Sequence, residues 1–362
     1  MSDLLSYRWA LSDAIFTKDK GKVFSCFACG GGSTMGYKLA GFDVVGVNEI
    51  DQRMADIYIK NHNPKYAFIE GIQTFKHRND LPKELYELDI LDGSPPCSSF
   101  SMSGNREKDW GKEKKFKEGQ ADQVLDTLFY DFIDLAEKLQ PKIVIAENVT
   151  GILKGNARDY VRRIMTAFDK AGYLMQEFEL DSSRMVVPQK RERVFFIAVR
   201  KDLVEQLPKP QGLLFCEFPN LNMNFGRSPI PFEEIRTECL RDNSWTDHDQ
   251  YIWDRRVIGD RKYSDVLIRV QGRNSNFNSS FIYPHKPVPT IASSEGSKYV
   301  LFDEPRKMNS KEMILAQSFP LDYDFGSDKC GKVQYVVGMS VPPLMIAHLS
   351  LRIYNEWRVL FD

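Results

Sequence analysis

The chain has 362 residues, of which 42% are hydrophobic and 27% charged, with a formal net charge of −1. This composition excludes a disordered chain, and the length predicts two domains or one large domain with an insertion. The near-zero charge excludes a globally basic surface, so any nucleic-acid binding must come from local basic patches.

Short apolar runs alternate with longer amphipathic stretches over the first two hundred residues. The runs predict buried strands at Lys22–Phe27, Asp43–Val47, Leu88–Leu91, Ile143–Ala146 and Val194–Val199. Thr127–Leu139 and Ala157–Ala171 have apolar residues near helical period, and Gly172 is a helix stop. This alternation predicts a doubly wound α/β sheet, whose ligands bind at the carboxyl ends of the strands.

After Pro208 the alternation is lost, and the chain becomes rich in Asn, Ser, Asp, Arg and aromatic residues without a long helical pattern. A helical pattern resumes after Pro305. The simplest interpretation is one α/β domain made of both ends of the chain, with a smaller domain inserted between them. No apolar run is long enough to span a bilayer, and the first residues lack the features of a signal peptide.

Val23–Gly36, VFSCFACGGGSTMG, runs from a predicted strand through a glycine cluster into a helix. Glycine allows a sharp turn and close approach of the backbone to a ligand, while the helix start offers free N–H groups. A phosphate-binding GK[ST] ending is missing, which favours a nucleoside ligand without a phosphate chain. Glu49 ends the next strand, where a doubly wound fold places a carboxylate for ribose hydroxyls. A tight turn with a solvated acid is the alternative.

Six cysteines are scattered along the chain and do not predict a disulfide framework. Cys26 and Cys29 form a CxxC pair, but no second pair follows, so we expect no metal site. Cys97 follows Pro-Pro at the end of a predicted strand in DGSPPCSSFS, which favours an exposed, rigidly held thiol. A buried structural cysteine is the alternative.

Two further groups follow strands of the same predicted sheet. Glu147 comes after the Ile143–Ala146 run, and Arg191 and Arg193 stand in QKRERVFF. Taken alone, Glu147 has the alternative of a helix-capping acid, and the two arginines have the alternative of a solvated strand face. Together with Cys97, they predict a thiol, a carboxylate and paired guanidiniums at one cleft.

In order, these motifs resemble the DNA cytosine-5 methyltransferase family, as do two segments near the end of the chain. The matching segments are Phe27–Gly36, Asn48–Asp51, Pro95–Cys97, Glu147–Val149, Gln189–Arg193, Arg306–Pro320 and Gln334–Pro343. The resemblance implies a Rossmann-like methyltransferase sheet with an inserted target-recognition domain. It assigns residues 1–205 to the catalytic domain, 206–300 to target recognition and 301–362 to a segment that completes the catalytic domain.

The resemblance implies S-adenosylmethionine as the methyl donor and a cytosine flipped out of duplex DNA as the substrate. The Cys97 thiolate would add to carbon 6 of the ring. Glu147 would hydrogen-bond N3 and the exocyclic amine, and Arg193, with Arg191, would hold the O2 side.

The resemblance also assigns residues to the two ligands. The expected cofactor-binding residues are Phe27, Gly30, Gly32, Glu49, Ile50, Ile72, Pro96 and Met339. The expected DNA-binding residues are Ser98, Arg106, Lys112 and Thr290. Arg106 and Lys112 belong to a Gly- and Lys-rich stretch, residues 100–120, which we interpret as a lid over DNA phosphates; an ordinary solvated loop is the alternative.

Arginines and aromatic residues are interleaved in the expected recognition region, as suits phosphate and base-edge contact. They are Arg241, Arg255, Arg256, Arg261, Lys262, Arg269, Arg273, Trp245, Tyr251, Trp253 and Tyr263. Acidic residues are also dense there, so an ordinary charged surface is the alternative.

The chain departs from the family pattern at several positions. Ser25 stands where an acid is frequent, Glu70-Gly71 where an aspartate contacts adenine, Ser98 where Gln follows the nucleophile, and Met339 where Asn follows glycine. These changes bear on cofactor binding and leave Cys97, Glu147 and Arg193 intact.

We therefore predict an active DNA (cytosine-5) methyltransferase, acting as a monomer with a cognate restriction endonuclease as a possible partner. We expect it in the cytoplasm or on the nucleoid of a bacterium, or encoded by a phage, with no membrane association. A tRNA cytosine-5 methyltransferase and a catalytically silent DNA-binding homologue are the alternatives.

Overall fold

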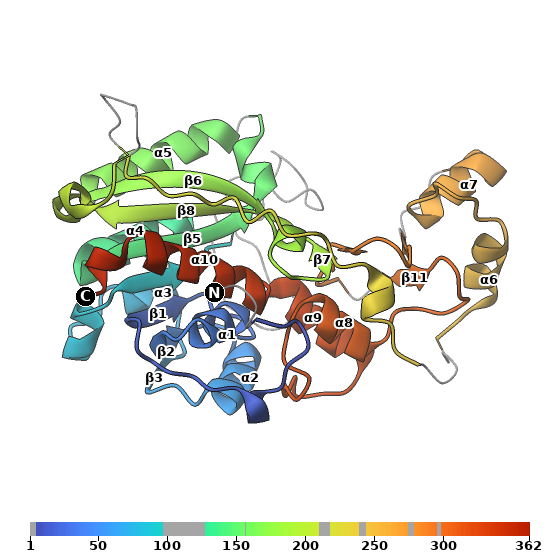
Figure 1. Cartoon of the computed structure of the whole chain (residues 1–362), viewed down its shortest axis with the longest axis horizontal. Helices are drawn as coiled ribbons and strands as arrows, with labels where there is room; N and C mark the ends of the chain where they lie inside the picture. The colour runs from blue at the N-terminus through green and yellow to red at the C-terminus, as the bar shows by residue number, and fades with distance from the viewer. Residues whose placement is uncertain are drawn as a thin grey trace. The chain divides into compact units, whose positions relative to one another are not determined.

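The computed structural model describes residues 5–96, 127–155, 157–209, 218–238, 244–273, 279–294 and 298–362. The chain forms two compact units (Figure 1). The sheet unit comprises Ile15–Leu180, Glu192–Asn224 and Ile346–Asp362. The second unit comprises Met1–Ala14, Asp181–Arg191 and Phe225–Met345.

A seven-stranded sheet in the order β3-β2-β1-β4-β5-β8-β6 forms the centre of the sheet unit. Its strands are β1 (Lys22–Cys26), β2 (Asp43–Asn48), β3 (Tyr66–Phe68), β4 (Ile90–Gly93), β5 (Ile143–Val149), β6 (Tyr173–Asp181) and β8 (Glu192–Arg200). The first five strands run parallel, and β8 is antiparallel to β5. The carboxyl ends of β1, β2, β4 and β5 therefore share one edge of the sheet, and the predicted α/β class is confirmed.

The sheet unit contains helices α1 (Gly32–Leu39), α2 (Gln52–His62), α3 (Ile72–Phe75), α4 (Leu128–Leu139) and α5 (Ala157–Lys170). On one face of the sheet, alternate residues such as Val144 and Phe196 pack in a core with α3, α4 and α5. Phe129 of α4 meets Phe196 edge to face, with 5.8 Å between ring centroids. Burial of such side chains stabilises the fold by about 1.5–3 kcal/mol each.

The end of the chain returns to the sheet unit. Helix α10 (Pro343–Glu356) carries Tyr354, whose ring lies 6.1 Å from that of Phe42, and Phe361 lies 5.8 Å from the same ring. Trp357 is fully buried, and its indole N–H donates to the carbonyl of Asn220. Aromatic burial thus fixes the C-terminal residues next to β2.

The second unit contains smaller elements. They are β7 (Gln189–Lys190), α6 (Asp247–Asp254), α7 (Tyr263–Gln271), β9 (Ser280–Ile282), β10 (Val288–Pro289), β11 (Tyr299–Leu301), α8 (Ser310–Ala316) and α9 (Cys330–Met339). Strand β7 pairs with β10, and β9 pairs with β11. Ile252 of α6 and Leu267 of α7 share a small core with Phe281 and Val300.

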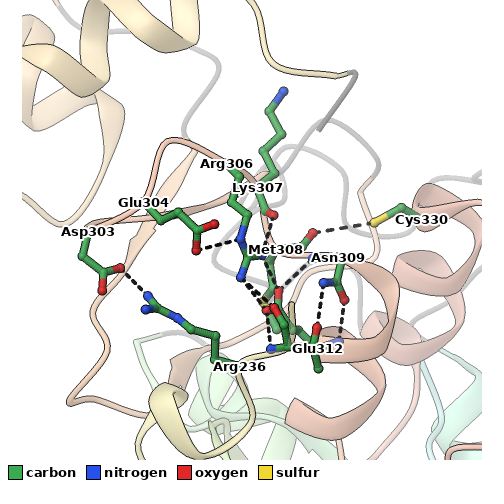
Figure 2. Close-up of polar contacts among 10 residues, drawn as sticks. Arg236, Asp303, Glu304, Arg306, Lys307, Met308, Asn309, Glu312 and Cys330 are labelled. Atoms are coloured by element: carbon green, nitrogen blue, oxygen red, sulfur yellow. Dashed lines mark hydrogen bonds and ion pairs between the residues drawn. The ribbon is translucent and has the colours of Figure 1, made fainter. Parts of the chain in front are cut away.

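A buried ion-pair network joins segments of the second unit that are distant in the sequence (Figure 2). The Arg306 guanidinium is 5% exposed and donates to both oxygens of Glu312, which is fully buried, at 2.8 and 3.0 Å. Arg306 also pairs with Glu304 and donates to the carbonyl of Thr237. Asn309 and Glu312 cap α8 reciprocally, so the network fixes both the helix start and the segment at Thr237.

The structure differs from the sequence-based expectation in local detail. Phe27 was expected in the first strand, but β1 ends at Cys26 and Phe27 adopts a left-handed φ of 52° in the following turn. Helices α6 and α7 lie in the region expected to lack long helices; both are short, and tertiary packing stabilises them. Residues 301–345 belong to the same compact unit as 225–300. The target-recognition role of 206–300 stays a prediction.

Candidate active site

The turn between β1 and α1 has an unusual backbone. Phe27, Cys29 and Gly31 have left-handed φ values of 52°, 48° and 83°. Gly31 is the N-cap of α1, so the first N–H groups of that helix lie directly after the turn. Gly30 and Gly32 are buried, and Phe27 is half-buried.

Glu49 closes this turn from the neighbouring strand. Its carboxylate accepts hydrogen bonds from the backbone N–H of Cys29 at 2.7 Å and of Asp51 at 2.9 Å. Burial raises the pKa of Glu49. Glu49 therefore holds the glycine turn in addition to any contact with a ligand. Ile50 is half-buried, and Ile72, the first residue of α3, is buried.

These residues fit a nucleoside cofactor without a phosphate chain. The turn offers backbone N–H groups and the acidic Glu49, and Val23–Gly36 contains no lysine or arginine. At the expected adenine contact, Glu70 pairs with Arg78 at 2.8 Å, and Gly71 has no side chain to replace an aspartate. The Glu70 carboxylate is thus already engaged at this position.

The segment that leads to Cys97 is held against β5 at Pro95. The Asn148 side-chain amide donates to the Pro95 carbonyl at 3.1 Å, and Asn148 is buried. Asn148 therefore holds the Pro95-Pro96 segment against the end of β5, a contact that sequence reasoning missed. Cys97, Ser98, Arg106 and Lys112 lie outside the described residues.

Glu147 and Arg193 form the central pair of the site. Arg193 Nε lies 2.8 Å from Glu147 Oε1, and both side chains are nearly buried, at 13% and 11% exposure. Arg193 also donates to the carbonyl of Glu192. An ion pair at this edge presents one carboxylate and one guanidinium, which are complementary to a ring with both donors and acceptors.

Arg191 has different surroundings from Arg193. It belongs to the second unit, where its buried guanidinium donates to the carbonyls of Ile291 at 3.0 Å and of Gly338 at 2.8 Å. Thr290 is exposed and donates to the carbonyl of Lys190 at 2.9 Å. Met339, the last residue of α9, is 45% exposed. The described contacts of Arg191 connect the segment after β10 with the end of α9.

Arginines of the expected recognition region contact its own aromatic residues. Arg256 lies 3.3 Å from the centre of the Trp253 ring, and Arg255 lies 3.8 Å from that of Tyr251. Arg269 pairs with Asp260 at 2.8 Å. Arg261 is exposed, and its guanidinium has no ion-pair partner within the described residues.

A buried carboxyl that sequence reasoning missed lies on β4. Asp92 is 3% exposed and accepts hydrogen bonds from Ser25 and Tyr37. The signal was present, because an acidic residue within the buried strand Ile90–Gly93 is unusual. Within the described ranges, no three His, Cys, Asp or Glu side chains gather as metal ligands.

Residues 21–355 match the family model described as C-5 cytosine-specific DNA methylase. The chain belongs to this family.

Relatives that match most of the chain agree with this assignment. The chain is 32% identical to the type II methyltransferase M.NgoPII of Neisseria gonorrhoeae, over 89% of this chain and 92% of that protein. It is 28% identical to M.DdeI of Desulfomicrobium norvegicum, over 91% and 88% of the two chains. The protein is a DNA cytosine-5 methyltransferase, and this family uses S-adenosylmethionine in general.

Solved structures share the methyltransferase fold. A putative DNA modification methyltransferase encoded within an Escherichia coli prophage superposes with a TM-score of 0.63 and 20% identity, over 93% of this chain and 99% of that one. A DNMT2 variant from Spodoptera frugiperda gives a TM-score of 0.61 and 17% identity, over 94% and 99%. The predicted Rossmann-like methyltransferase fold is confirmed.

One segment of the methyltransferase, Cys330–Glu356, is long and apolar enough to cross a membrane by length and composition alone. However, 78% of its most apolar window is buried in the protein. Helices α9 and α10 within this segment supply core residues such as Val337 and Leu344, so burial in the fold explains the composition.

Proposed function

We propose that the protein methylates carbon 5 of a cytosine flipped out of duplex DNA, through a covalent bond between Cys97 and carbon 6. The observation that carries the proposal is the Glu147–Arg193 pair at the end of β5. The same strand end holds Pro95 through Asn148, two residues before the thiol. A polar pair that can bind one edge of a ring is thus fixed beside the segment that leads to the nucleophile.

The protein's own groups activate the ring. Carbon 5 of cytosine is a weak nucleophile, so the Cys97 thiolate first forms a bond to carbon 6 and pushes electron density to carbon 5. Glu147 in its protonated form donates its proton toward N3, where negative charge develops, and its other oxygen accepts from the exocyclic amine, while Arg193 donates to O2. After carbon 5 is methylated, loss of its proton to a base lets the Cys97–carbon 6 bond break and restores the aromatic ring.

We assign the S-adenosylmethionine site to the turn after β1 and the ends of the neighbouring strands. Phe27, Gly30, Gly32, Glu49, Ile50, Ile72, Pro96 and Met339 would hold the cofactor. When bound, it supplies an electrophilic methyl group on its sulfonium sulfur. The hydrogen bonds of Glu49 to Cys29 and Asp51 support this assignment, because they preform the turn before any ligand binds.

We assign DNA contact to the lid at residues 100–120, which includes Arg106 and Lys112, to Ser98, and to residues 206–300 with Thr290. The exposed Arg261 supports the recognition role, because an exposed guanidinium can bind phosphate or a base edge. Because the similar proteins are named type II methyltransferases, we propose a role in restriction and modification, as a monomer beside a cognate endonuclease.

A mechanism-based trap tests the covalent step. Purified protein is incubated with S-adenosylmethionine and duplex DNA containing 5-fluorocytosine, whose carbon 5 cannot lose a proton. We expect a denaturation-resistant protein–DNA complex, and none with Cys97→Ser. The matched control is Cys330→Ser, which changes an exposed cysteine on α9 and should still trap DNA.

Transfer of labelled methyl groups to ordinary duplex DNA and to total tRNA distinguishes the substrates. Label in DNA as 5-methylcytosine supports the proposal. Label in tRNA alone would mean that the substrate is RNA and that the proposed mechanism acts on it. Methylation of DNA without a Cys97-dependent trapped complex would overturn the covalent mechanism.

A further inference from the structure

Asp92 lies within the sheet, directly beside the proposed cofactor turn. Its Cα partner on β1 is Ser25, two residues before the turn that starts at Phe27, and its partner on β5 is Ile145. Only 3% of Asp92 is exposed. The mechanism proposed above gives this carboxyl no role.

Two hydroxyl groups bind the Asp92 carboxyl, one from each side of the turn. Ser25 Oγ donates to Oδ2 at 2.8 Å from β1, which leads into the turn. Tyr37 donates to Oδ1 at 3.1 Å from α1, which leaves the turn. The carboxyl therefore joins both segments that frame the proposed cofactor site. Its described partners are neutral, unlike the arginine that pairs with Glu147.

Burial raises the pKa of Asp92 to about 7, the nearby Glu147 charge adds to this rise, and the two hydroxyls oppose it. The titratable groups that face Asp92 are Cys26 on β1, Tyr37 on α1, Tyr58 on α2 and Glu147 on β5. Burial raises the pKa of Cys26 and of both tyrosines, so these three stay neutral near pH 7. Asp92, whose pKa is about 7, therefore gains charge around neutrality.

We infer that the Asp92 carboxylate makes the cofactor site favour the positively charged S-adenosylmethionine over its product, S-adenosylhomocysteine, in which sulfur is neutral. The inference rests on the proposed function, which supplies the cofactor. Charges interact strongly in the low-dielectric interior of a protein, so the sulfonium does not need to touch Asp92. This preference favours dissociation of S-adenosylhomocysteine after the reaction and binding of S-adenosylmethionine for the next one.

The direction of the pH effect follows from linkage. A bound cation stabilises the ionised carboxylate and therefore lowers the pKa of Asp92 below its value in the free protein. Binding of S-adenosylmethionine then strengthens as pH rises through about 7 and is weakest where Asp92 is protonated in both states. Binding of S-adenosylhomocysteine, whose sulfur is neutral, does not lower the pKa of Asp92 in this way. Both ligands carry the same amino and carboxyl groups, so their ratio of affinities isolates the sulfonium.

The experiment measures the dissociation constants of both ligands by calorimetry from pH 5.5 to 8.5, with the full chain and without DNA. We expect the preference for S-adenosylmethionine to rise about three- to tenfold over this range, because one pKa unit corresponds to a factor of ten. Asp92→Asn should make the ratio independent of pH. Ser25→Ala and Tyr37→Phe each remove one donor to the carboxylate and should move the midpoint to higher pH.

Asp89→Asn is the matched control. Asp89 precedes β4 at its other end and pairs with Lys142 at 2.8 Å, so its loss should leave the ratio curve unchanged. A flat ratio in the unaltered protein would overturn the inference. A pH-dependent ratio that persists in Asp92→Asn would also overturn it. If Asp92→Asn does not fold, the inference is overturned by a midpoint of the ratio curve that stays unchanged in Ser25→Ala and Tyr37→Phe. Failure to bind either ligand would contradict the proposed cofactor itself, a different outcome from binding both without a pH effect.

Discussion

Arg193 Nε lies 2.8 Å from Glu147 Oε1, across the neighbouring antiparallel strands β8 and β5. The two side chains come from parts of the sequence separated by helix α5 and strands β6 and β7, and each is nearly buried. Each therefore orients the other before a substrate arrives. Such preorganisation places polar groups where charge develops on the ring, at no further cost during the reaction.

Loss of either partner should remove most methyl transfer. We expect Glu147→Gln to lower the rate about 100- to 1000-fold, as for loss of one charge-stabilising group. Arg193→Ala should also lower it strongly, because Glu147 would lose its orientation. The double variant should be little worse than Glu147→Gln, since the two residues act as a unit. Single-turnover methyl transfer is the measurement. Fully additive losses would contradict a coupled pair.

Asn148 should act on the rate through the Pro95 carbonyl. Asn148→Ala removes the 3.1 Å hydrogen bond and frees the Pro95-Pro96 segment, so we expect a loss of about tenfold in kcat, the equivalent of one net hydrogen bond. Affinity for S-adenosylmethionine should change less. Steady-state kinetics measure kcat, and a titration with S-adenosylmethionine measures the affinity for the cofactor. An equal loss in cofactor affinity would show that Asn148 supports the whole edge of the sheet.

Arg306 and Glu312 should be important for stability. Removing one partner of a buried pair leaves a charge without compensation, so Arg306→Ala should destabilise the protein by about 3–5 kcal/mol. Urea unfolding measures the effect. The matched control is Arg358→Ala, which removes an ion pair with both partners more than half exposed and should cost less than about 1 kcal/mol. Equal effects of the two variants would contradict the importance of burial.

Gly338 should not accept a side chain. A Cβ atom there would lie 2.5 Å from the backbone nitrogen of Ser293 and 2.6 Å from the Ala292 carbonyl carbon. Backbone atoms cannot move aside cheaply, so Gly338→Ala should cost about 3 kcal/mol or more. Gly172→Ala is the comparison: no atom of the described residues lies within 4 Å of a Cβ placed there, but its φ of 90° should cost about 1–2 kcal/mol. Thermal unfolding ranks the two variants, and the opposite order would contradict the steric argument.

Arg261 should contribute to DNA binding without supporting the fold. Because its exposed guanidinium has no ion-pair partner among the described residues, we expect Arg261→Ala to weaken DNA binding and to reduce the salt dependence of affinity by about one phosphate contact. Fluorescence anisotropy at several salt concentrations is the measurement. Arg162→Ala, which changes an exposed arginine on α5, is the control. An unchanged salt slope for Arg261→Ala would exclude a phosphate contact.

The local sequence determined much of the sheet. Strands such as β5 are buried on both faces, so continuous apolar runs such as Ile143–Ala146 mark them without knowledge of the fold. The order of motifs likewise identified the family, and with it the α/β class. β6 was missed because it is an edge strand of mixed burial, and α6 and α7 were missed because eight or nine residues give a weak helical period.

Only the tertiary structure distinguished residues that look alike in the sequence. Arg191 and Arg193 share one motif, yet Arg193 meets Glu147 while Arg191 binds two backbone carbonyls in the second unit. Asp92 acquires its partner Ser25 through the pairing of β1 with β4, across 67 positions of sequence. A side chain's type follows from the chain alone, but its burial and its partners depend on which strands pair, and those long-range contacts decide its charge and its role.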